Sequence, residues 1–534
     1  MYRTRGKKCL EQQCEMIKDD NDSILINLDR VQKRWAEYIT SLYSEVNTNK
    51  RSIWNRKMIA GPITSKEIKH AIKILQMENE IEYNNIPFEF KTLPDCELVE
   101  IVNHVYDSKI TFEKLLESIF MVLPKRSETV YEKVIILMIY VSKIVLKVML
   151  IRNRTTIRKR KTVEQFGYRF EKETTNAIFC MRMLMEKCIE KQKDMYICCI
   201  NYVKPFTCVK YDKLRELQEK LKIDRNDLRL INNLYDDEKK AINFHRKIND
   251  WIDMKKECVL SPDLFNLYSE EALGKIKACE GVDLEGTNYN NFRYADNIVL
   301  IADSEEKLQS ILDIITRESE RVGSEIKSQK SCVMVTSKKA LIPECCVMVN
   351  GIQIEQVNSF KYLGSWITSD GRSDTDIKYR IDLAKKAFMD MKNILCAHNI
   401  KIENRKYLFN YYIRPILLYG CESWTITKNM EKRLEAVEVW FWRNMINITR
   451  ISDEYTLDST EIKKELLHTI KLRQLNFIGR ELRKEGGIEK NIMKAEMAGK
   501  RARGRQRSKM LDWMTKEFNI KDGEQLGVII ENWK

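Results

Sequence analysis

The sequence predicts an α+β fold, and three observations lead to this class. The chain has 534 residues, 43% hydrophobic and 32% charged, with only 18 glycines and 8 prolines, which is typical of a globular, largely helical protein. Apolar residues at helical spacing fill most of the chain. Two apolar runs flank a polar turn at 292–302, which predicts a β-hairpin with the carboxylate of Asp296 at its tip. This length exceeds a single core, so roughly two to four domains are expected.

The charge and the cysteines restrict the class of protein further. A formal net charge of +15 favours a polyanionic partner, nucleic acid first and an acidic membrane second, with a merely basic soluble protein as the alternative. The fifteen cysteines contain no C-x-x-C pair, and the five histidines lie far from the two adjacent cysteine pairs, so no zinc site is predicted. An odd cysteine count without a signal peptide is typical of reduced thiols in the cytosol or nucleus.

The apolar runs of the sequence indicate whether the protein is secreted and whether it contacts a membrane. The N-terminal residues are polar, and no apolar stretch follows their basic residues, so we expect a nuclear or cytoplasmic protein that is not secreted. The longest apolar run, 134–141, is followed by Lys143 and Lys147. It is too short to span a bilayer and is therefore predicted to be a buried helix, and no membrane partner is expected.

The first part of the chain is predicted to be mostly helical. A helix is expected over 24–42, and another begins after Thr64, because Glu67 three residues later completes a capping box. Residues 118–124 predict a strand that ends at a proline. The continuous apolar run at 195–202 predicts a strand buried on both faces.

The remaining elements follow the same periodicities. Ser261 and Pro262 are typical of a helix N-cap and of the first helical position. In chain order, the sequence predicts helices at 208–247, 261–272 and 304–322, short strands at 332–336, 345–350 and 360–368, and helices from 375 onward.

Several segments, in the same order, resemble the reverse transcriptase region of non-LTR retrotransposons of insect and other animal genomes. The hairpin at 292–302 is similar to the Tyr/Phe-Ala-Asp-Asp hairpin of that family, with Asn297 in place of the second aspartate. The other matching segments are Gln165–Arg169, Thr174–Ile178, Cys258–Tyr268, Phe360–Gly364, Tyr419–Trp424 and the tail from Gly499. The resemblance runs from about residue 30 to about residue 515, so we expect the sequence to lack the endonuclease domain of that family.

The resemblance implies a right-hand polymerase fold, with fingers, a palm built on a small antiparallel sheet, and a helical thumb. Helical N- and C-terminal extensions flank these parts. The expected divisions are a helical N-terminal extension at 1–115, fingers and palm at 116–372, the thumb at 373–445, and a basic helical C-terminal region at 446–534.

The family holds two Mg²⁺ ions with three palm carboxylates, one ion activating the primer 3′-hydroxyl and the other neutralising the triphosphate. Carried over by position, the three ligands fall on Asn201, Asp296 and Asn297, so a single carboxylate remains. The resemblance also implies nucleotide or template contacts at Phe206, Arg169, Ser261, Pro262 and Lys330. Without the resemblance, Asp296 and Asn297 are simply good turn residues.

The expected function is that of an RNA-directed DNA polymerase, with an RNA template, a DNA primer and deoxynucleotides as partners and Mg²⁺ as cofactor. Loss of two metal ligands predicts little or no activity, because metal stabilisation is worth several kcal/mol and each ~1.4 kcal/mol is about tenfold in rate. Two alternatives stay open: a non-catalytic nucleic-acid-binding protein and a decayed transposon reading frame. The sequence does not indicate an oligomeric state.

Two basic clusters, at 152–161 and 500–509, are predicted to contact nucleic-acid phosphates. Such runs are usually solvated faces, but beside a polymerase-like core a surface that follows the phosphate backbone is expected. The residues concerned are Arg158, Lys159, Arg160, Arg501, Arg503, Arg505 and Arg507.

Overall fold

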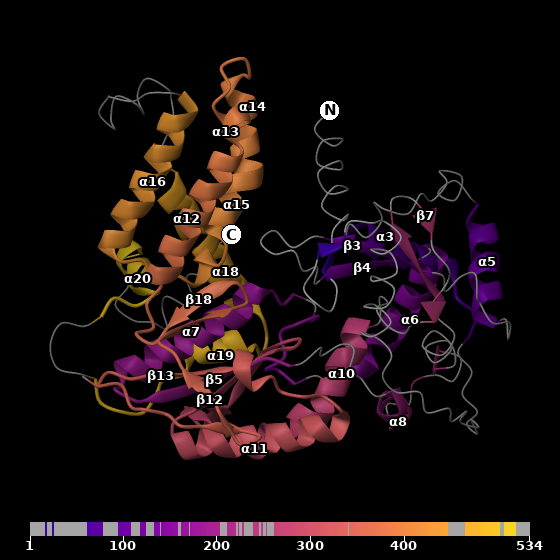
Figure 1. Cartoon of the computed structure of the whole chain (residues 1–534), viewed down its shortest axis with the longest axis horizontal. Coiled ribbons are helices and arrows are strands. Elements are labelled where there is room, and N and C mark those ends of the chain that lie inside the picture. Colours follow the sequence, from indigo (N-terminus) through magenta and orange to yellow (C-terminus); the bar gives the residue numbers. More distant parts are fainter. Residues whose placement is uncertain are drawn as a thin grey trace. The chain divides into compact units, whose positions relative to one another are not determined.

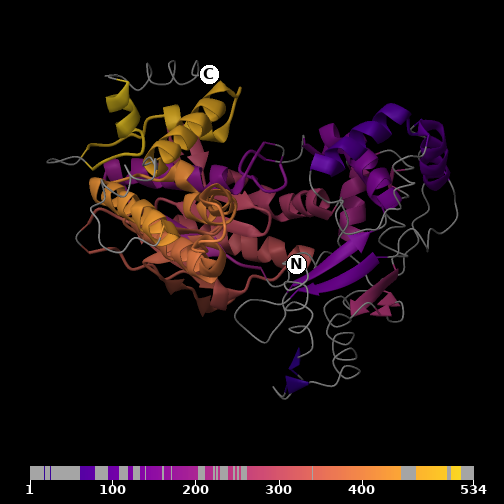
Figure 2. The same cartoon turned by 90° about the horizontal axis from the view of Figure 1, so that it is seen from above.

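The computed structural model divides into two compact units (Figures 1 and 2). Unit 1 comprises Met1–Lys161, Lys204–Glu271 and Val322–Ser324, and unit 2 comprises Thr162–Val203, Ala272–Arg321 and Glu325–Lys534. Within them, the structure describes residues 17–18, 24–25, 61–77, 94–107, 118–123, 133–138, 140–158, 162–169, 171–202, 211–220, 223, 227–228, 239–244, 247–248, 252–253, 261–339, 341–446, 465–501 and 507–518.

Unit 1 combines helices with a two-stranded sheet and a separate five-stranded mixed sheet. Its strands are β1 (Ile17–Lys18), β2 (Ile24–Leu25), β3 (Ser118–Leu123), β4 (Lys133–Met138), β6 (Lys239–Phe244), β7 (Lys247–Ile248) and β8 (Ile252–Asp253). Its helices are α3 (Ser65–Met77), α5 (Asp95–Asp107), α6 (Tyr140–Arg158), α8 (Tyr211–Lys220) and α10 (Ser261–Leu273), the last of which ends at the start of unit 2. Strand β3 pairs antiparallel with β4 and parallel with β6.

The predicted capping box of α3 is confirmed. The Thr64 backbone amide donates to Glu67 Oε2 at 2.9 Å, and the Glu67 amide donates to Thr64 Oγ1 at 3.4 Å. Arg152 of α6 also donates to Glu67, Nε to Oε1 at 2.7 Å, and this bond is the main reason why the pKa of Glu67 falls to about 2. The cap therefore ties α3 to α6 as well as starting the helix.

Three sequence expectations in unit 1 are wrong. The apolar run 134–141, predicted to be a buried helix, forms strand β4, and α6 begins only at Tyr140. Periodicity cannot separate a short buried helix from a strand, and here the β-branched residues pair with β3. The helix predicted over 208–247 is α8 followed by strand β6, which also pairs with β3. Ile24–Leu25 pair with β1, and the rest of the helix predicted at 24–42 lies outside the described residues.

Unit 2 is built around a five-stranded sheet of order β11-β12-β5-β13-β16. The strands are β11 (Asn291–Tyr294), β12 (Asn297–Ala302), β5 (Met195–Ile200), β13 (Cys332–Thr336) and β16 (Glu355–Gln356), and all pairs are antiparallel except β13 with β16. Alternate residues of β5 and β12 enter two separate cores. One core lies under α7 (Thr174–Glu190) and the other under α11 (Glu305–Val322), so these helices cover opposite faces (Figure 1).

Short elements surround the sheet and connect it to the helices after it. They are η1 (Gly274–Ala278), β9 (Val282–Leu284), β10 (Thr287–Tyr289), η2 (Ser328–Lys330), β14 (Met348–Val349), β15 (Ile352–Gln353), β17 (Ser359–Tyr362) and β18 (Ser365–Thr368). The strands predicted at 195–202, 332–336 and 360–368, the hairpin at 292–302 and the helix at 304–322 are confirmed. Of the strand predicted at 345–350, only Met348–Val349 is extended and paired.

A helical segment follows the sheet, as predicted from residue 375 onward. It contains α12 (Asp374–Asp390), α13 (Lys392–Leu395), α14 (Ile402–Leu408), the π-helix η3 (Phe409–Ile413), α15 (Arg414–Leu418), η4 (Cys421–Ser423) and α16 (Lys428–Ile446). The C-terminal helices α18 (Leu466–Arg483), α19 (Ile488–Lys494) and α20 (Asp512–Glu517) contribute to the core beneath α7. The α+β prediction is confirmed, and the architecture is consistent with the right-hand fold that the resemblance implies. Within the described residues, no helix has the length and apolar character needed to cross a membrane.

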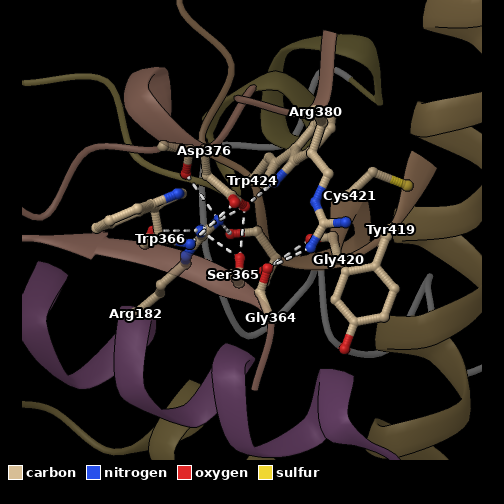
Figure 3. A network of polar contacts seen from close by, with 12 residues as sticks. Arg182, Gly364, Ser365, Trp366, Asp376, Arg380, Tyr419, Gly420, Cys421 and Trp424 are labelled. Carbon is tan, nitrogen blue, oxygen red and sulfur yellow. Dashed lines mark hydrogen bonds and ion pairs between the residues drawn. The ribbon is translucent and has the colours of Figure 1, made fainter. Parts of the chain in front are cut away.

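Within unit 2, a buried carboxylate joins α7 and β18 to the helical segment that begins with α12 (Figure 3). Asp376 of α12 accepts hydrogen bonds at 2.9 Å each from Arg182 Nη2 of α7, from the Trp366 backbone amide of β18 and from Trp424 Nε1. The hydroxyl of Ser365 donates to the same carboxylate. Asp376 is fully buried, and its four donors come from three other segments.

We predict that Asp376→Asn destabilises the protein strongly. The substitution leaves the buried Arg182 guanidinium without a counter-charge, a change that typically costs roughly 3–5 kcal/mol. Urea denaturation measures the free energy of unfolding. Asp382→Asn, at an exposed position of the same helix, is the matched control and is expected to change that free energy by less than about 0.5 kcal/mol. Equal effects of the two substitutions would contradict the assigned role.

Candidate functional site

Asp296 lies at the tip of the β11–β12 hairpin. Tyr294 pairs with Asn297, and the two residues between them make the turn. Ala295 has a left-handed backbone, with φ of 55°, and the carboxylate of Asp296 follows it. Asn297 Nδ2 donates to Asp296 Oδ1 at 3.2 Å. Burial raises the pKa of Asp296, partly offset by a hydrogen bond from its own backbone amide.

The segment 162–169 packs against this turn and is hydrogen-bonded to it. The side chain of Gln165 is buried, and its Oε1 accepts hydrogen bonds from the amide of Ala295 at 3.1 Å and from that of Gly167 at 2.9 Å. Backbone bonds join the segment to β11, with the Phe166 amide donating to the carbonyl of Arg293 at 2.8 Å. A Cβ at position 167 would lie 2.3 Å from the Ala295 nitrogen. The turn therefore rests directly on Gly167.

Asn201 lies at the same end of the sheet as the hairpin tip. Ile200 pairs with Ile298, so the register places the next residues, Asn201 and Asn297, opposite each other. Cβ atoms of such neighbours are about 4.5–5.5 Å apart. Asn201 Nδ2 donates to the Lys330 carbonyl at 2.7 Å, and the Asn201 carbonyl accepts from the Lys327 amide at 2.8 Å. The structure thus brings together the three positions that the resemblance assigns to metal ligands, with the backbone of Lys330 beside them.

The chemistry of these three positions is one carboxylate and two amides. Among the residues that the structure describes, no group of three or more histidine, cysteine, aspartate or glutamate side chains could hold a metal ion. The amide group of Asn201 directs its hydrogens at a carbonyl, which a carboxylate could not do. Asn201 therefore takes part in holding the turn at 327–331 against the end of β5.

The other predicted contacts are placed as follows. Arg169, which is half-buried, donates from Nη1 to the Thr162 carbonyl at 3.0 Å in unit 2. Pro262 lies in the first turn of α10 in unit 1. Helix α10 begins at Ser261, and the side chain of this residue is outside what the structure describes. Phe206 also lies outside the described residues.

Three cations of the C-terminal cluster lie against a carboxylate or a carbonyl. Arg501 Nε forms an ion pair with Glu190 Oε1 at 2.5 Å, and Lys509 Nζ approaches the same oxygen at 2.7 Å. Arg507 donates to the carbonyl of Asp370. A role of these cations in phosphate binding stays a prediction. Arg503, Arg505, Lys159 and Arg160 lie outside the described residues, as does the side chain of Arg158 at the end of α6.

Glu186, a half-buried residue of α7, contacts the same C-terminal segment. Glu186 Oε2 accepts hydrogen bonds from the Met510 amide at 2.9 Å and from Thr425 Oγ1 at 3.4 Å. Burial raises the pKa of Glu186 to about 7, although the hydrogen bond from Met510 and the charges of Arg507 and Lys509 oppose this rise. The protonation state of Glu186 therefore affects how the segment 507–518 packs on α7.

Two contributions to the site were missed by sequence reasoning. Gln165 belongs to a segment that resembles the family, but its hydrogen bond to the hairpin turn spans 130 residues and has no local signature. The structural bond of Asn201 to Lys330 was not expected either, because an asparagine at a ligand position indicates only a lost ligand. The nearest sequence signal was the glycine at 167, which marks a close approach of backbone.

Comparison with known proteins agrees with the geometry. Residues 124–367 match the family model described as "Reverse transcriptase (RNA-dependent DNA polymerase)". Over 262 residues, the chain is 27% identical to an uncharacterized transposon-derived protein of Caenorhabditis elegans, covering 47% of this chain and 92% of that protein. The matched segment is therefore reverse-transcriptase-like, and the chain is similar to a transposon-derived protein.

Solved structures give a weaker likeness. A truncated apo telomerase from Candida tropicalis has a TM-score of 0.34 at 9% identity and covers 49% of this chain, which spans 55% of that chain. Telomerase from Candida albicans in complex with a fragment of telomeric RNA has a TM-score of 0.35 at 10% identity, covering 74% of this chain and 68% of that chain. TM-scores of this size carry no conclusion about this chain.

We predict that Gly167→Ala destabilises unit 2. The new Cβ would overlap the backbone at Ala295, which cannot move aside as a flexible side chain could, and overpacking of this kind typically costs about 1–3 kcal/mol. Urea denaturation reports the change. Gly274→Ala is the matched control, because no atom lies within 4 Å of a Cβ built there. A neutral Gly167→Ala would show that the turn does not rest on this residue.

We also predict a pH dependence that arises from Glu186. Its pKa is about 7 in the folded protein, against an ordinary value of 4.5, so the folded state binds the proton more tightly. The free energy of unfolding therefore falls as pH rises from about 4.5 to about 7, by roughly 3 kcal/mol. Glu186→Gln is expected to remove this part of the pH dependence in urea denaturation. Glu320→Gln, at an exposed position of α11, controls for the loss of one carboxylate, and identical pH profiles for all three proteins would exclude the effect.

Proposed function

We propose that the chain is the reverse-transcriptase-like protein of a non-LTR retrotransposon, an RNA-directed DNA polymerase by family, whose polymerase site is impaired. The observation that carries this proposal is the end of the central sheet, where Asn201, Asp296 and Asn297 come together with one charge among them. The match over residues 124–367 supports the family, because it includes all three of these positions.

The side-chain oxygens available as metal ligands at this end of the sheet do not fit a pair of Mg²⁺ ions. Phosphoryl transfer of the family type depends on two ions held together, and each ion favours anionic oxygen ligands. Asp296 supplies one carboxylate, and the Asn201 amide is engaged with the carbonyl of Lys330. An asparagine oxygen brings no charge, so two of the three expected charges are missing. We therefore propose no metal-dependent step for this chain.

The proposal includes an arrangement of parts. Fingers and palm correspond to 116–372, the thumb to 373–445, and the N- and C-terminal extensions to 1–115 and 446–534. The antiparallel sheet with helices on both faces supports the palm, and α12 to α16 support the helical thumb.

RNA template, DNA primer and deoxynucleotides are the proposed partners, in the nucleus or the cytoplasm. The formal net charge of +15 supports a polyanionic partner whether or not chemistry takes place. It therefore supports the second candidate as well, a protein that binds nucleic acid without catalysis.

A primer-extension assay on an RNA template, with Mg²⁺ or Mn²⁺, tests the proposal. We expect the unaltered protein to extend the primer at least ~10⁴-fold more slowly than the double variant Asn201→Asp/Asn297→Asp, because two ligand charges are restored. Adding Asp296→Ala to the double variant is expected to abolish the gain. Unfolding midpoints of all variants separate loss of activity from loss of fold.

Robust extension by the unaltered protein that disappears with Asp296→Ala would show that one carboxylate suffices. A folded double variant without any gain would show that the two amides are not what limits activity. Either result would reject the proposed cause of impairment.

A further inference from the structure

Two cysteines face each other across neighbouring strands of the central sheet. Cys199 of β5 pairs directly with Cys332 of β13 in the antiparallel register. Cys199 belongs to the core beneath α7, and Cys332 packs against the same core, so the two side chains lie on the same face of the sheet. Both are free thiols in the structure.

This arrangement satisfies the distance requirement of a disulfide. Directly opposed residues of antiparallel strands have Cα atoms about 4.5–5.5 Å apart, and disulfides join Cα atoms about 4.4–6.8 Å apart. The adjacent Cys198 is excluded from this pairing, because it enters the core beneath α11 and lies opposite Val333.

The two sulfurs are not equivalent. Cys332 is half-buried, whereas Cys199 is buried. Oxidation of cysteine follows exposure, so a small oxidant reaches the sulfur of Cys332 first, and the buried sulfur of Cys199 then reacts with it.

We infer that Cys199 and Cys332 form a reversible cross-strand disulfide when the protein meets a peroxide. The Cys332 thiolate attacks one oxygen of hydrogen peroxide, the O–O bond breaks, and the departing hydroxide takes up a proton to leave as water. Cys332 then carries a sulfenic acid. The Cys199 sulfur attacks the Cys332 sulfur, the S–O bond breaks, and the leaving hydroxide takes the Cys199 proton. Two thiols and one peroxide thus give one disulfide and two waters.

The disulfide would lie close to the candidate site, because each cysteine is two positions away from a residue of that site. Asn201 follows Cys199 by two positions, and Lys330 precedes Cys332 by two positions. The disulfide therefore reinforces the same strand junction that the hydrogen bond from Asn201 to Lys330 makes. This modification site does not depend on polymerase activity.

Peptide mapping of the full-length protein tests the inference. The reduced protein is freed of reductant, exposed to an equimolar amount of hydrogen peroxide, alkylated and digested without reduction, and its peptides are measured by mass spectrometry. We expect the peptide that contains Cys199 to be linked to the peptide that contains Cys332, with complete loss of the link after treatment with a dithiol. Mapping the unaltered protein requires no substitution, so a folding defect cannot obscure this result.

Two variants identify the partner of Cys332. Cys198→Ser is the matched control, a buried neighbour in the same strand and peptide, and it is expected to keep the link. Cys199→Ser is expected to lose the link and to leave Cys332 as an oxidised, uncrosslinked acid. A link that survives Cys199→Ser, a link from Cys332 to any other cysteine, or full alkylation of both residues after peroxide would overturn the inference.

Discussion

The structure of unit 2 depends on the burial of one carboxylate, that of Asp376. A charged group removed from water is tolerated only when other groups replace the hydration it has lost. Arg182 supplies the counter-charge from α7, and the Trp366 amide and the Trp424 indole supply further donors. Without the acid, the buried Arg182 guanidinium would lack its counter-charge and the Trp424 indole would lose its hydrogen-bond acceptor. Hydrogen bonds to this one carboxylate therefore connect α7, the β17–β18 hairpin and the helical segment that begins with α12.

The same principle recurs where the C-terminal helices meet α7. Glu489 of α19 is fully buried, and it accepts hydrogen bonds from Lys172 at 2.5 Å and from Asn176 at 2.8 Å. Glu438 of α16 accepts from the backbone amides that begin α18. Buried acids thus fix the positions of helices that are far apart in sequence, and hydrophobic packing beneath α7 fills the space between them.

Local patterns predicted the elements that depend on local pairing. The hairpin at 292–302 and the strand at 332–336 have alternating or continuous apolar character bounded by turn residues, so the sequence located them closely. Strand β4 was mistaken for a helix because its identity depends on β3 as a pairing partner, which lies in a separate segment. The hydrogen-bond partners of Asp376 could not be predicted from the sequence, because Arg182, for example, is 194 residues away. The candidate site was placed by resemblance, and its support by Gln165 became visible only in three dimensions.

Two aspartates of unit 2 differ in what the fold requires of them. Asp376 is fully buried and accepts four hydrogen bonds, one of them from a guanidinium. Asp296 accepts one hydrogen bond from the amide of Asn297 and one from its own backbone, and burial raises its pKa. A partly desolvated carboxylate with so few donors gains from an added cation. Asn201 differs from Asp296, because its amide donates to the Lys330 carbonyl and so joins the end of β5 to the turn before β13. At this end of the sheet, one side chain therefore stabilises the fold through a hydrogen bond, and the neighbouring carboxylate keeps acceptor capacity.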